Sequence, residues 1–114
     1  MQIHYLEIVT NDVRATCTNY EKTFGAEFGE PEPGLGNARI VALASGGMIG
    51  VRAPMHESEH PVVRPYLLVE DIDQAVSSAE NLGAEIAHPP MEIQGYGKFA
   101  IYIQGGVHHG LWQL

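Results

Sequence analysis

Residues 71–86 read DIDQAVSSAENLGAEI and carry the signals of one helix together with both of its boundaries. Asp71 can cap a helix over roughly residues 72–82, because its carboxylate can accept hydrogen bonds from the first-turn N–H groups. Gly83 can end that helix, since glycine readily adopts the left-handed conformation that follows a last turn. Between them, apolar residues recur at helical spacing and predict one buried face, formed by Ile72, Ala75, Val76, Ala79 and Leu82.

The same pattern occurs about 60 residues earlier in the chain, which indicates an internal repeat. Asn11 or Asp12 can cap a helix over roughly residues 13–24, and GAEF at residues 25–28 matches GAEI at residues 83–86. Further matches follow in the same order, between residues 34–40 and 95–101, between Gly46 and Gly106, and between Gly50 and Gly110. The chain is therefore predicted to hold two copies of one unit.

Short strand-like runs complete each copy. One run precedes each helix, at residues 2–9 in the first copy and 63–69 in the second. Three more runs follow the first helix, at residues 26–30, 37–44 and 47–52. Three likewise follow the second helix, at residues 84–88, 98–104 and 107–113. This order predicts an α+β fold of two β-α-β-β-β modules in a single domain, with module one at 1–52, a linker at 53–62 and module two at 63–114. One helix covers only one face of a four-stranded sheet. We therefore expect the two bare faces to enclose a cavity within an eight-stranded, cup-shaped double sheet.

Composition excludes several classes of function. The chain has 14 acidic and 6 basic residues, and its formal charge of −8 argues against a nucleic-acid partner. No apolar run approaches the length of a membrane span, and no secretory signal is expected. The single Cys17 cannot form an internal disulfide, which favours a reducing compartment and predicts a cytoplasmic protein. Within its helix, Cys17 is expected to be an inert buried thiol.

Three short segments give the chain a resemblance to a known superfamily. They are Val-Thr-Asn-Asp12 followed by Tyr20 and Phe24-Gly25, Val-Glu-Asp71-Ile-Asp73, and Gly110-Leu111-Trp112-Gln113. With the paired β-α-β-β-β order, the chain resembles the vicinal oxygen chelate superfamily over essentially its whole length. That superfamily includes glyoxalase I, bleomycin-resistance proteins, extradiol dioxygenases and fosfomycin-resistance enzymes. The resemblance implies the fold and a homodimer, whereas the superfamily's functions are diverse.

The resemblance also implies four metal-ligand positions, on the first and last strands of each copy. They fall on Tyr5, Gly50, Arg64 and Gly110. Glycine offers no side chain and arginine cannot ligate at neutral pH, so the resemblance predicts this fold without its usual metal and without a cofactor. A one-residue slip in register would bring in His4 and His109 instead. The matched glycines of the two copies argue against that slip.

Strand alternation then predicts which side chains face the cavity. They are Tyr5, Glu7, Arg52, Arg64, Tyr66 and Trp112, and His108 could reach the cavity rim. Glu7 and Arg64 could form a structural ion pair, because buried charges are costly unless paired. Alternatively, an arginine captures a carboxylate or phosphate of a ligand while the aromatic rings stack on its body. Glu7 would then be a candidate general base.

Other residues have structural interpretations. For Trp112 the pattern favours a core plug over a ligand-binding ring. Tyr20 and Phe24, four residues apart on the first helix, are expected to anchor the core. His56 and His60 have the spacing of a helical zinc site, but they lie in the linker with prolines and acidic residues, which predicts solvated side chains.

The leading hypothesis is a metal-independent, dimeric, cytoplasmic protein that binds a small organic molecule, aromatic or anionic, in the cavity. The first alternative is a glyoxalase-like isomerase or lyase that uses Glu7 as general base, or a divalent-metal enzyme with unforeseen ligands. A third possibility is a dimeric interaction module whose cavity is filled by its own side chains.

Overall fold

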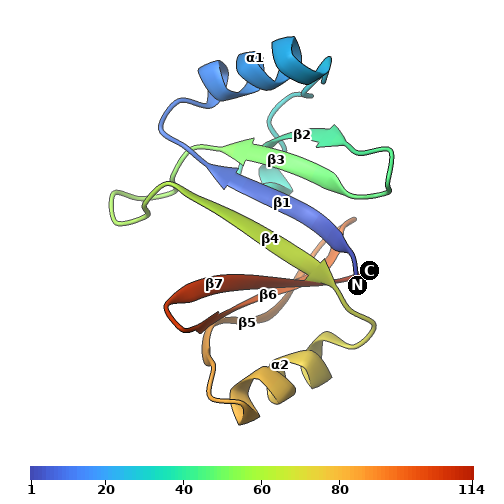
Figure 1. Cartoon of the computed structure of the whole chain (residues 1–114), viewed down its shortest axis with the longest axis vertical. Helices are drawn as coiled ribbons and strands as arrows, with labels where there is room; N and C mark the ends of the chain where they lie inside the picture. Colours follow the sequence, from blue (N-terminus) through green and yellow to red (C-terminus); the bar gives the residue numbers. More distant parts are fainter. The chain divides into compact units, whose positions relative to one another are not determined.

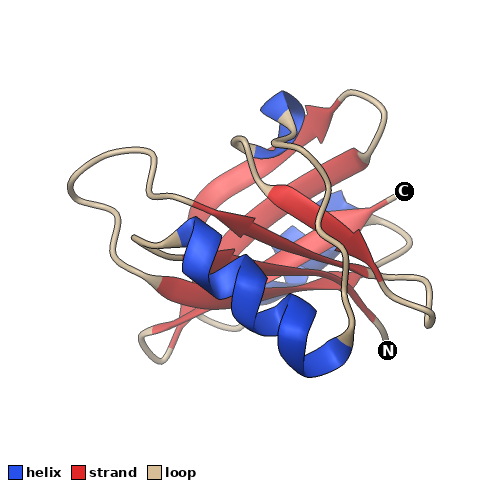
Figure 2. Ribbon diagram, turned by 90° about the horizontal axis from the view of Figure 1, so that it is seen from above, coloured by secondary structure: helices blue, strands red, loops and turns tan.

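The structure is a computed structural model that describes residues 1–114, and it has an α+β fold. Seven strands form one mixed sheet that carries two α-helices (Figure 1). The chain divides into two compact units, one made of residues 1–5 with 64–114 and the other of residues 6–63. Loops of varied length join the helices and strands (Figure 2), and neither helix is long and apolar enough to cross a membrane.

The unit of residues 6–63 is built on three strands and one helix. Strand β1 (Ile3–Val9), of which residues 6–9 lie in this unit, is followed by α1 (Val13–Phe24), the short 3-10 helix η1 (Pro33–Leu35), β2 (Arg39–Ala42) and β3 (Met48–Arg52). The strands lie in the order β2-β3-β1, with β2 and β3 antiparallel. Helix α1 packs on the strands through an apolar cluster formed by Ile8, Cys17, Phe28 and Val51.

Both predicted boundaries of α1 are confirmed. The Asp12 carboxylate accepts a hydrogen bond from the Ala15 N–H at 3.1 Å. Gly25 has a φ of 71°, and its N–H donates to the Glu21 carbonyl at 2.9 Å. The left-handed conformation at residue 25 is one that only glycine adopts without strain.

The predicted strand at residues 26–30 is absent, which leaves seven strands where eight were expected. The segment runs beside β2, where the Gly29 N–H donates to the Ile40 carbonyl. However, the Arg39 guanidinium, and not a strand N–H, donates to the carbonyls of Phe28 and Gly29. Pro31 follows directly and has no N–H to extend a ladder. A side chain thus replaces regular strand pairing here.

The other unit has four strands in the order β4-β7-β6-β5, covered by one helix. Along the chain, its elements are β4 (Val62–Leu68), the helix α2 (Ile72–Asn81), β5 (Glu85–Ile93), β6 (Gly97–Gln104) and β7 (Val107–Gln113). Strands β4 and β7 are parallel, whereas β5, β6 and β7 are antiparallel. The core under α2 consists of Ile72, Ala100 and Leu111. Asp71 caps α2 as predicted, through a hydrogen bond from the Gln74 N–H.

Strand β5 is longer than the predicted run at residues 84–88 and ends the strand order of its unit. It continues through Pro89 and Pro90, and its register against β6 shifts on both sides of His88. Proline cannot donate a ladder hydrogen bond, so it is tolerated in strands mainly at edges and bulges. The register shifts are the structural cost of continuing this strand past two prolines.

The prediction of a core position is wrong for two residues. Phe24 is 73% exposed and Leu82 is 76% exposed, and they lie at or just beyond the last turn of α1 and α2. The helical spacing continues through these residues, but neither side chain belongs to the apolar cluster under its helix. Tyr20 does pack on its core cluster, and its ring centroid is 5.6 Å from that of Phe24.

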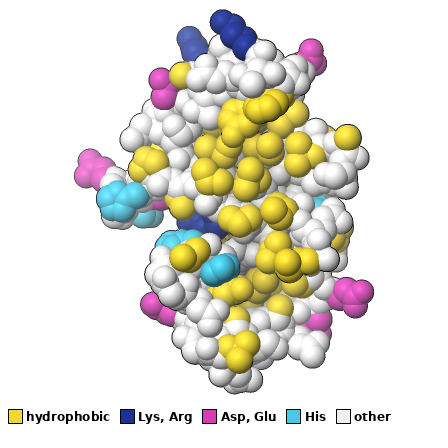
Figure 3. All heavy atoms as spheres, viewed as in Figure 1, with side chains coloured by type: hydrophobic (Ala, Val, Ile, Leu, Met, Phe, Trp, Pro, Cys, Tyr) yellow, Lys and Arg dark blue, Asp and Glu magenta, His cyan; other side chains and the backbone are white.

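The acidic surface is dispersed. On the face shown in Figure 3, acidic side chains stand apart from one another near the margins, while apolar side chains gather between them. Exposed apolar residues include Ile3, Val63 and Met91. On this face the acidic charge is therefore carried by separate side chains and not by one acidic patch.

Candidate functional site

All six side chains predicted to line the cavity are buried, although three of them can carry a charge. Glu7 and Arg52 lie in the unit of residues 6–63. The other unit holds Tyr5, Arg64, Tyr66 and Trp112, together with His108. Charged side chains are rarely buried to this extent unless they are paired. The structure therefore presents two groups of candidate residues, one in each unit.

The first group is an ion-pair network centred on Arg52 at the end of β3. Its Nε donates to Glu7 Oε2 at 2.8 Å, and its Nη1 and Nη2 donate to the two carboxylate oxygens of Glu59 at 2.8 and 2.7 Å. Nη1 also donates to the Ala53 carbonyl. Sequence reasoning expected Glu7 and Arg52 on one face, and the structure joins them directly. It missed Glu59, because nothing in a polar linker indicates which acidic residue folds back.

Electrostatics reinforce this network. Hydrogen bonding by Glu59, together with the nearby charge of Glu7, raises the pKa of Arg52 above its usual value against the opposing effect of burial. The guanidinium therefore stays charged at every relevant pH. The Glu7 carboxylate is engaged by this cation, which favours a structural role for Glu7 over that of a free base.

A pocket of about 480 Å³ adjoins the Arg52 network within the same unit. It is lined by Val13, Gly36, Asn37, Ala53, Pro54 and Met55. A Cβ at Gly36 would overlap the Met55 side chain and lie 3.1 Å from Arg52 Cδ. Both side chains therefore pack closely on the backbone of Gly36, which itself lines the pocket.

The second group contains three aromatic rings in mutual contact. The ring centroids of Tyr5, Tyr66 and Trp112 lie 5.4 to 5.7 Å apart, distances at which aromatic pairs attract one another. The Trp112 indole N–H donates to the Tyr96 carbonyl at 3.0 Å. This packing favours the plug interpretation of Trp112. His4 lies 5.5 Å from Trp112, and burial lowers the pKa of that imidazole.

Arg64 lies beside this aromatic cluster, on the same face of β4 as Tyr66. Its Nη2 is 3.4 Å from Nδ1 of His108 on β7, although the His108 residue is exposed. The Arg64 guanidinium is thus buried next to an imidazole that reaches solvent. That His108 reaches the rim of a cavity stays a prediction.

The residues at the four implied ligand positions do not fit a metal ion. They are Tyr5 on β1, Gly50 on β3, Arg64 on β4 and Gly110 on β7, of which none is an imidazole or a carboxylate. Nowhere in the chain do three or more His, Cys, Asp or Glu side chains gather in a metal-binding group. Gly110 does not open space for a ligand either, because a Cβ there would overlap the Tyr66 ring. That ring fills the volume in which a ligating side chain at position 110 would lie.

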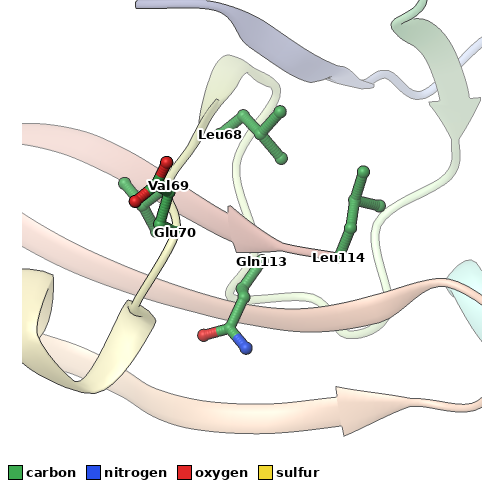
Figure 4. A pocket seen from close by; sticks show the side chains of 5 residues that line it. All are labelled: Leu68, Val69, Glu70, Gln113 and Leu114. Atoms are coloured by element: carbon green, nitrogen blue, oxygen red, sulfur yellow. The ribbon is translucent and has the colours of Figure 1, made fainter.

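A smaller pocket of about 350 Å³ lies in the unit of residues 1–5 and 64–114 (Figure 4). It is lined by Leu68, Val69, Glu70, Gln113 and Leu114. In Figure 4 Leu68 and Leu114 point to one side of β7 and Gln113 to the other. The side-chain amide oxygen of Gln113, Oε1, accepts a hydrogen bond from the Ile72 N–H at 2.8 Å, so this side chain helps hold the start of α2.

The remaining candidate residues are Cys17, His56 and His60, and their surroundings favour the structural interpretations given to them. Cys17 is fully buried in the core under α1, and burial raises the pKa of its thiol, as expected of an unreactive cysteine. In the linker, His56 Nδ1 lies 2.6 Å from the Ser58 hydroxyl oxygen, and His60 is exposed.

Relatives with known structures share the fold. Hypothetical protein BH1468 from Bacillus halodurans C-125 is 12% identical and has a TM-score of 0.78, with 99% of this chain and 94% of that chain covered. Methylmalonyl-CoA epimerase from Mycobacterium tuberculosis is 16% identical and has a TM-score of 0.75, with 97% and 86% covered. At these identities the similarity establishes the fold alone.

Sequence comparison defines the family. The chain is 27% identical over 116 residues to the "Putative glyoxylase CFP32" of Mycobacterium bovis and of Mycobacterium tuberculosis. This match covers 96% of the chain but only 44% of those proteins, so the chain spans less than half the length of these relatives. The model of the glyoxalase/bleomycin resistance protein/dioxygenase superfamily matches residues 2–105. The chain therefore belongs to the glyoxalase/bleomycin resistance protein/dioxygenase superfamily.

Proposed function

We propose that the protein binds a small organic anion through buried arginines, without a metal ion. The observation that carries this proposal is Arg64, a buried guanidinium that stands where the resemblance implies a metal ligand. A guanidinium offers a fork of N–H donors whose geometry matches a carboxylate or phosphate. Its positive charge can therefore hold the anion directly, as a metal ion would in other proteins of this fold.

The surroundings of Arg64 support an organic anion over a simple inorganic one. Tyr66 lies on the same face of β4, and the Tyr5 and Trp112 rings pack against it. The exposed His108 beside Arg64 gives the anion a second polar partner. An aromatic or aliphatic body carrying one carboxylate fits this combination of apolar wall and cationic head.

An isomerase or lyase with Glu7 as general base is the second candidate, and the names of the relatives favour it. The hydrogen bond from Arg52 to Glu7 supports instead a structural role for this carboxylate. We further propose that the protein acts as a homodimer in the cytoplasm. The family resemblance supports the dimer, and the lone Cys17 supports the reducing compartment.

The metal content of the purified protein tests the proposal that binding needs no metal ion. Protein purified without added metal should contain far less than one equivalent of Mn, Ni, Zn or Fe, because the four implied positions hold no imidazole or carboxylate. Elemental analysis by mass spectrometry would measure this, and EDTA should leave the melting temperature unchanged. One equivalent of any of these metals, retained through dialysis, would overturn metal-independent binding.

Anion recognition is tested with 3-phenylpropanoate and its neutral amide in isothermal titration calorimetry. The acid should bind and the amide should bind much more weakly, because only the acid carries a charge for the guanidinium. Replacing Arg64 with glutamine should weaken acid binding by about 10- to 100-fold, the usual worth of a hydrogen bond to a charged group.

The exposed Arg14 on α1 provides the matched control, since Arg14→Gln makes the same charge change away from the site. Equal affinity for the acid and the amide, or equal losses in the two arginine variants, would contradict the proposal.

A further inference from the structure

We propose that Glu59 is an internal latch that occupies the carboxylate subsite of Arg52, and that the ligand of this subsite is a monocarboxylate with an apolar body. The inference rests on the proposed function, because it takes an organic anion as the ligand. It adds a second carboxylate subsite at Arg52, separate from the one proposed at Arg64. It also adds a place for the apolar body of the ligand and a segment that must move.

The geometry of the Arg52–Glu59 pair is that of a bound ligand carboxylate. Two guanidinium nitrogens face the two oxygens of Glu59 in parallel, at 2.8 and 2.7 Å. This bidentate fork is the arrangement in which arginine recognises carboxylates in binding sites. Glu59 thus shows what a ligand carboxylate would look like at this position.

Glu59 and Glu7 hold Arg52 from different kinds of structure. Glu7 belongs to strand β1, and its side chain is 8% exposed. Glu59 belongs to a segment without helix or strand, between β3 and β4, and its side chain is 17% exposed. Glu7 is therefore a fixed partner of Arg52, whereas Glu59 can leave by a movement of the linker alone.

Release of Glu59 would also release Met55. The Met55 N–H donates to Glu59 Oε1 at 2.7 Å. The Met55 side chain packs on Gly36, beside Arg52, and lines the pocket of about 480 Å³. The pocket walls are mostly apolar, formed by residues such as Val13, Ala53 and Pro54. Opening the latch would join this apolar space to the guanidinium, which defines a ligand with an apolar body and one carboxylate.

The exchange conserves the buried charge. Arg52 has two carboxylate partners in the closed state, Glu7 and Glu59. A ligand carboxylate that replaces Glu59 leaves the same number of charges around Arg52. Neither state then holds an unpaired buried cation, which would be costly. A neutral ligand would remove Glu59 from Arg52 without replacing it, so the subsite selects for an anion.

Replacement of Glu59 with glutamine tests the latch. The test is made in the Arg64→Gln background, which removes the guanidinium of the other subsite. Glutamine at position 59 cannot compete as a charged partner, so the open state should become dominant. 3-Phenylpropanoate should then bind about tenfold more tightly by calorimetry than it binds to Arg64→Gln alone, as expected when a minor competent state becomes the major one. Glu57→Gln is the matched control, because Glu57 is an exposed acid in the same linker. In the same background, its affinity for 3-phenylpropanoate should equal that of Arg64→Gln alone.

Hydrogen exchange in the unmodified protein gives a readout that needs no variant. Adding 3-phenylpropanoate should speed amide exchange across residues 53–60, because the Met55 N–H loses its Glu59 acceptor. Slower or unchanged exchange there, or a folded Glu59→Gln variant that binds the acid no more tightly, would overturn the latch. Failure of every form to prefer the acid over its amide would instead overturn the proposed function, so the two failures are distinguishable.

Discussion

Replacing Arg52 with methionine should lower the free energy of unfolding by about 3–5 kcal/mol, the usual cost of removing one partner from a buried ion pair. Methionine fills much of the aliphatic volume, so the loss is mainly electrostatic. Glu59 can turn towards solvent from the linker, but Glu7 stays buried on β1 without its cation. Urea denaturation followed by circular dichroism would measure the change.

A double-mutant cycle separates charge from packing in this network. Adding Glu7→Gln to Arg52→Met removes the unpaired carboxylate, so the double variant should be more stable than Arg52→Met alone. The exposed Arg14 is the control, since Arg14→Met should change stability by less than about 0.5 kcal/mol. A double variant as unstable as the sum of the single variants would show that Glu7 and Arg52 contribute independently, contrary to the 2.8 Å contact between them.

Replacing Gly110 with alanine should destabilise the protein by about 3 kcal/mol, near the upper end of the usual cost of overpacking a core. The added methyl group would overlap the Tyr66 ring and lie 2.8 Å from the Pro65 carbonyl oxygen. Gly110 is paired with Tyr66 in the parallel ladder of β4 and β7, so relief requires a shift of strands and not of one flexible side chain. The midpoint of thermal unfolding should fall accordingly.

Gly29→Ala is the matched control for this substitution. A Cβ at Gly29 would meet only the Ile40 carbonyl oxygen, at an ordinary contact distance of 3.7 Å, so its effect should be small. Adding Tyr66→Ala to Gly110→Ala should recover part of the loss caused by Gly110→Ala, measured relative to Tyr66→Ala alone. A Gly110→Ala variant as stable as Gly29→Ala would contradict the close packing of Tyr66 on β7.

The order of the elements could be predicted because local signals determine it. Asp12 and Asp71 are short side chains that can reach the first-turn N–H groups, and Gly25 has the left-handed φ that its position requires. Strand alternation likewise predicted that Glu7 and Arg52 are buried, since the period of two follows from strand geometry. These predictions needed no knowledge of how the segments pack.

The features that could not be predicted from the sequence depend on contacts between residues far apart in the chain. The segment at 26–30 has the composition of a strand, but Arg39 binds the carbonyls of Phe28 and Gly29, and Pro31 ends the pairing. Phe24 has the spacing of a core residue and still lies beyond the core. Glu59 is one of two acidic residues in its linker, and only the folded chain brings it to Arg52. No local pattern distinguishes these cases.

Strand β5 has a consequence for how the protein behaves when it is concentrated. A regular edge strand presents a row of N–H and C=O groups on which another chain can add a strand, and this is a common start of aggregation. Pro89 and Pro90 remove two successive donors, and the register shifts around His88 interrupt the row further. An incoming strand would meet a broken template there, so β5 protects this border of the sheet against intermolecular strand addition.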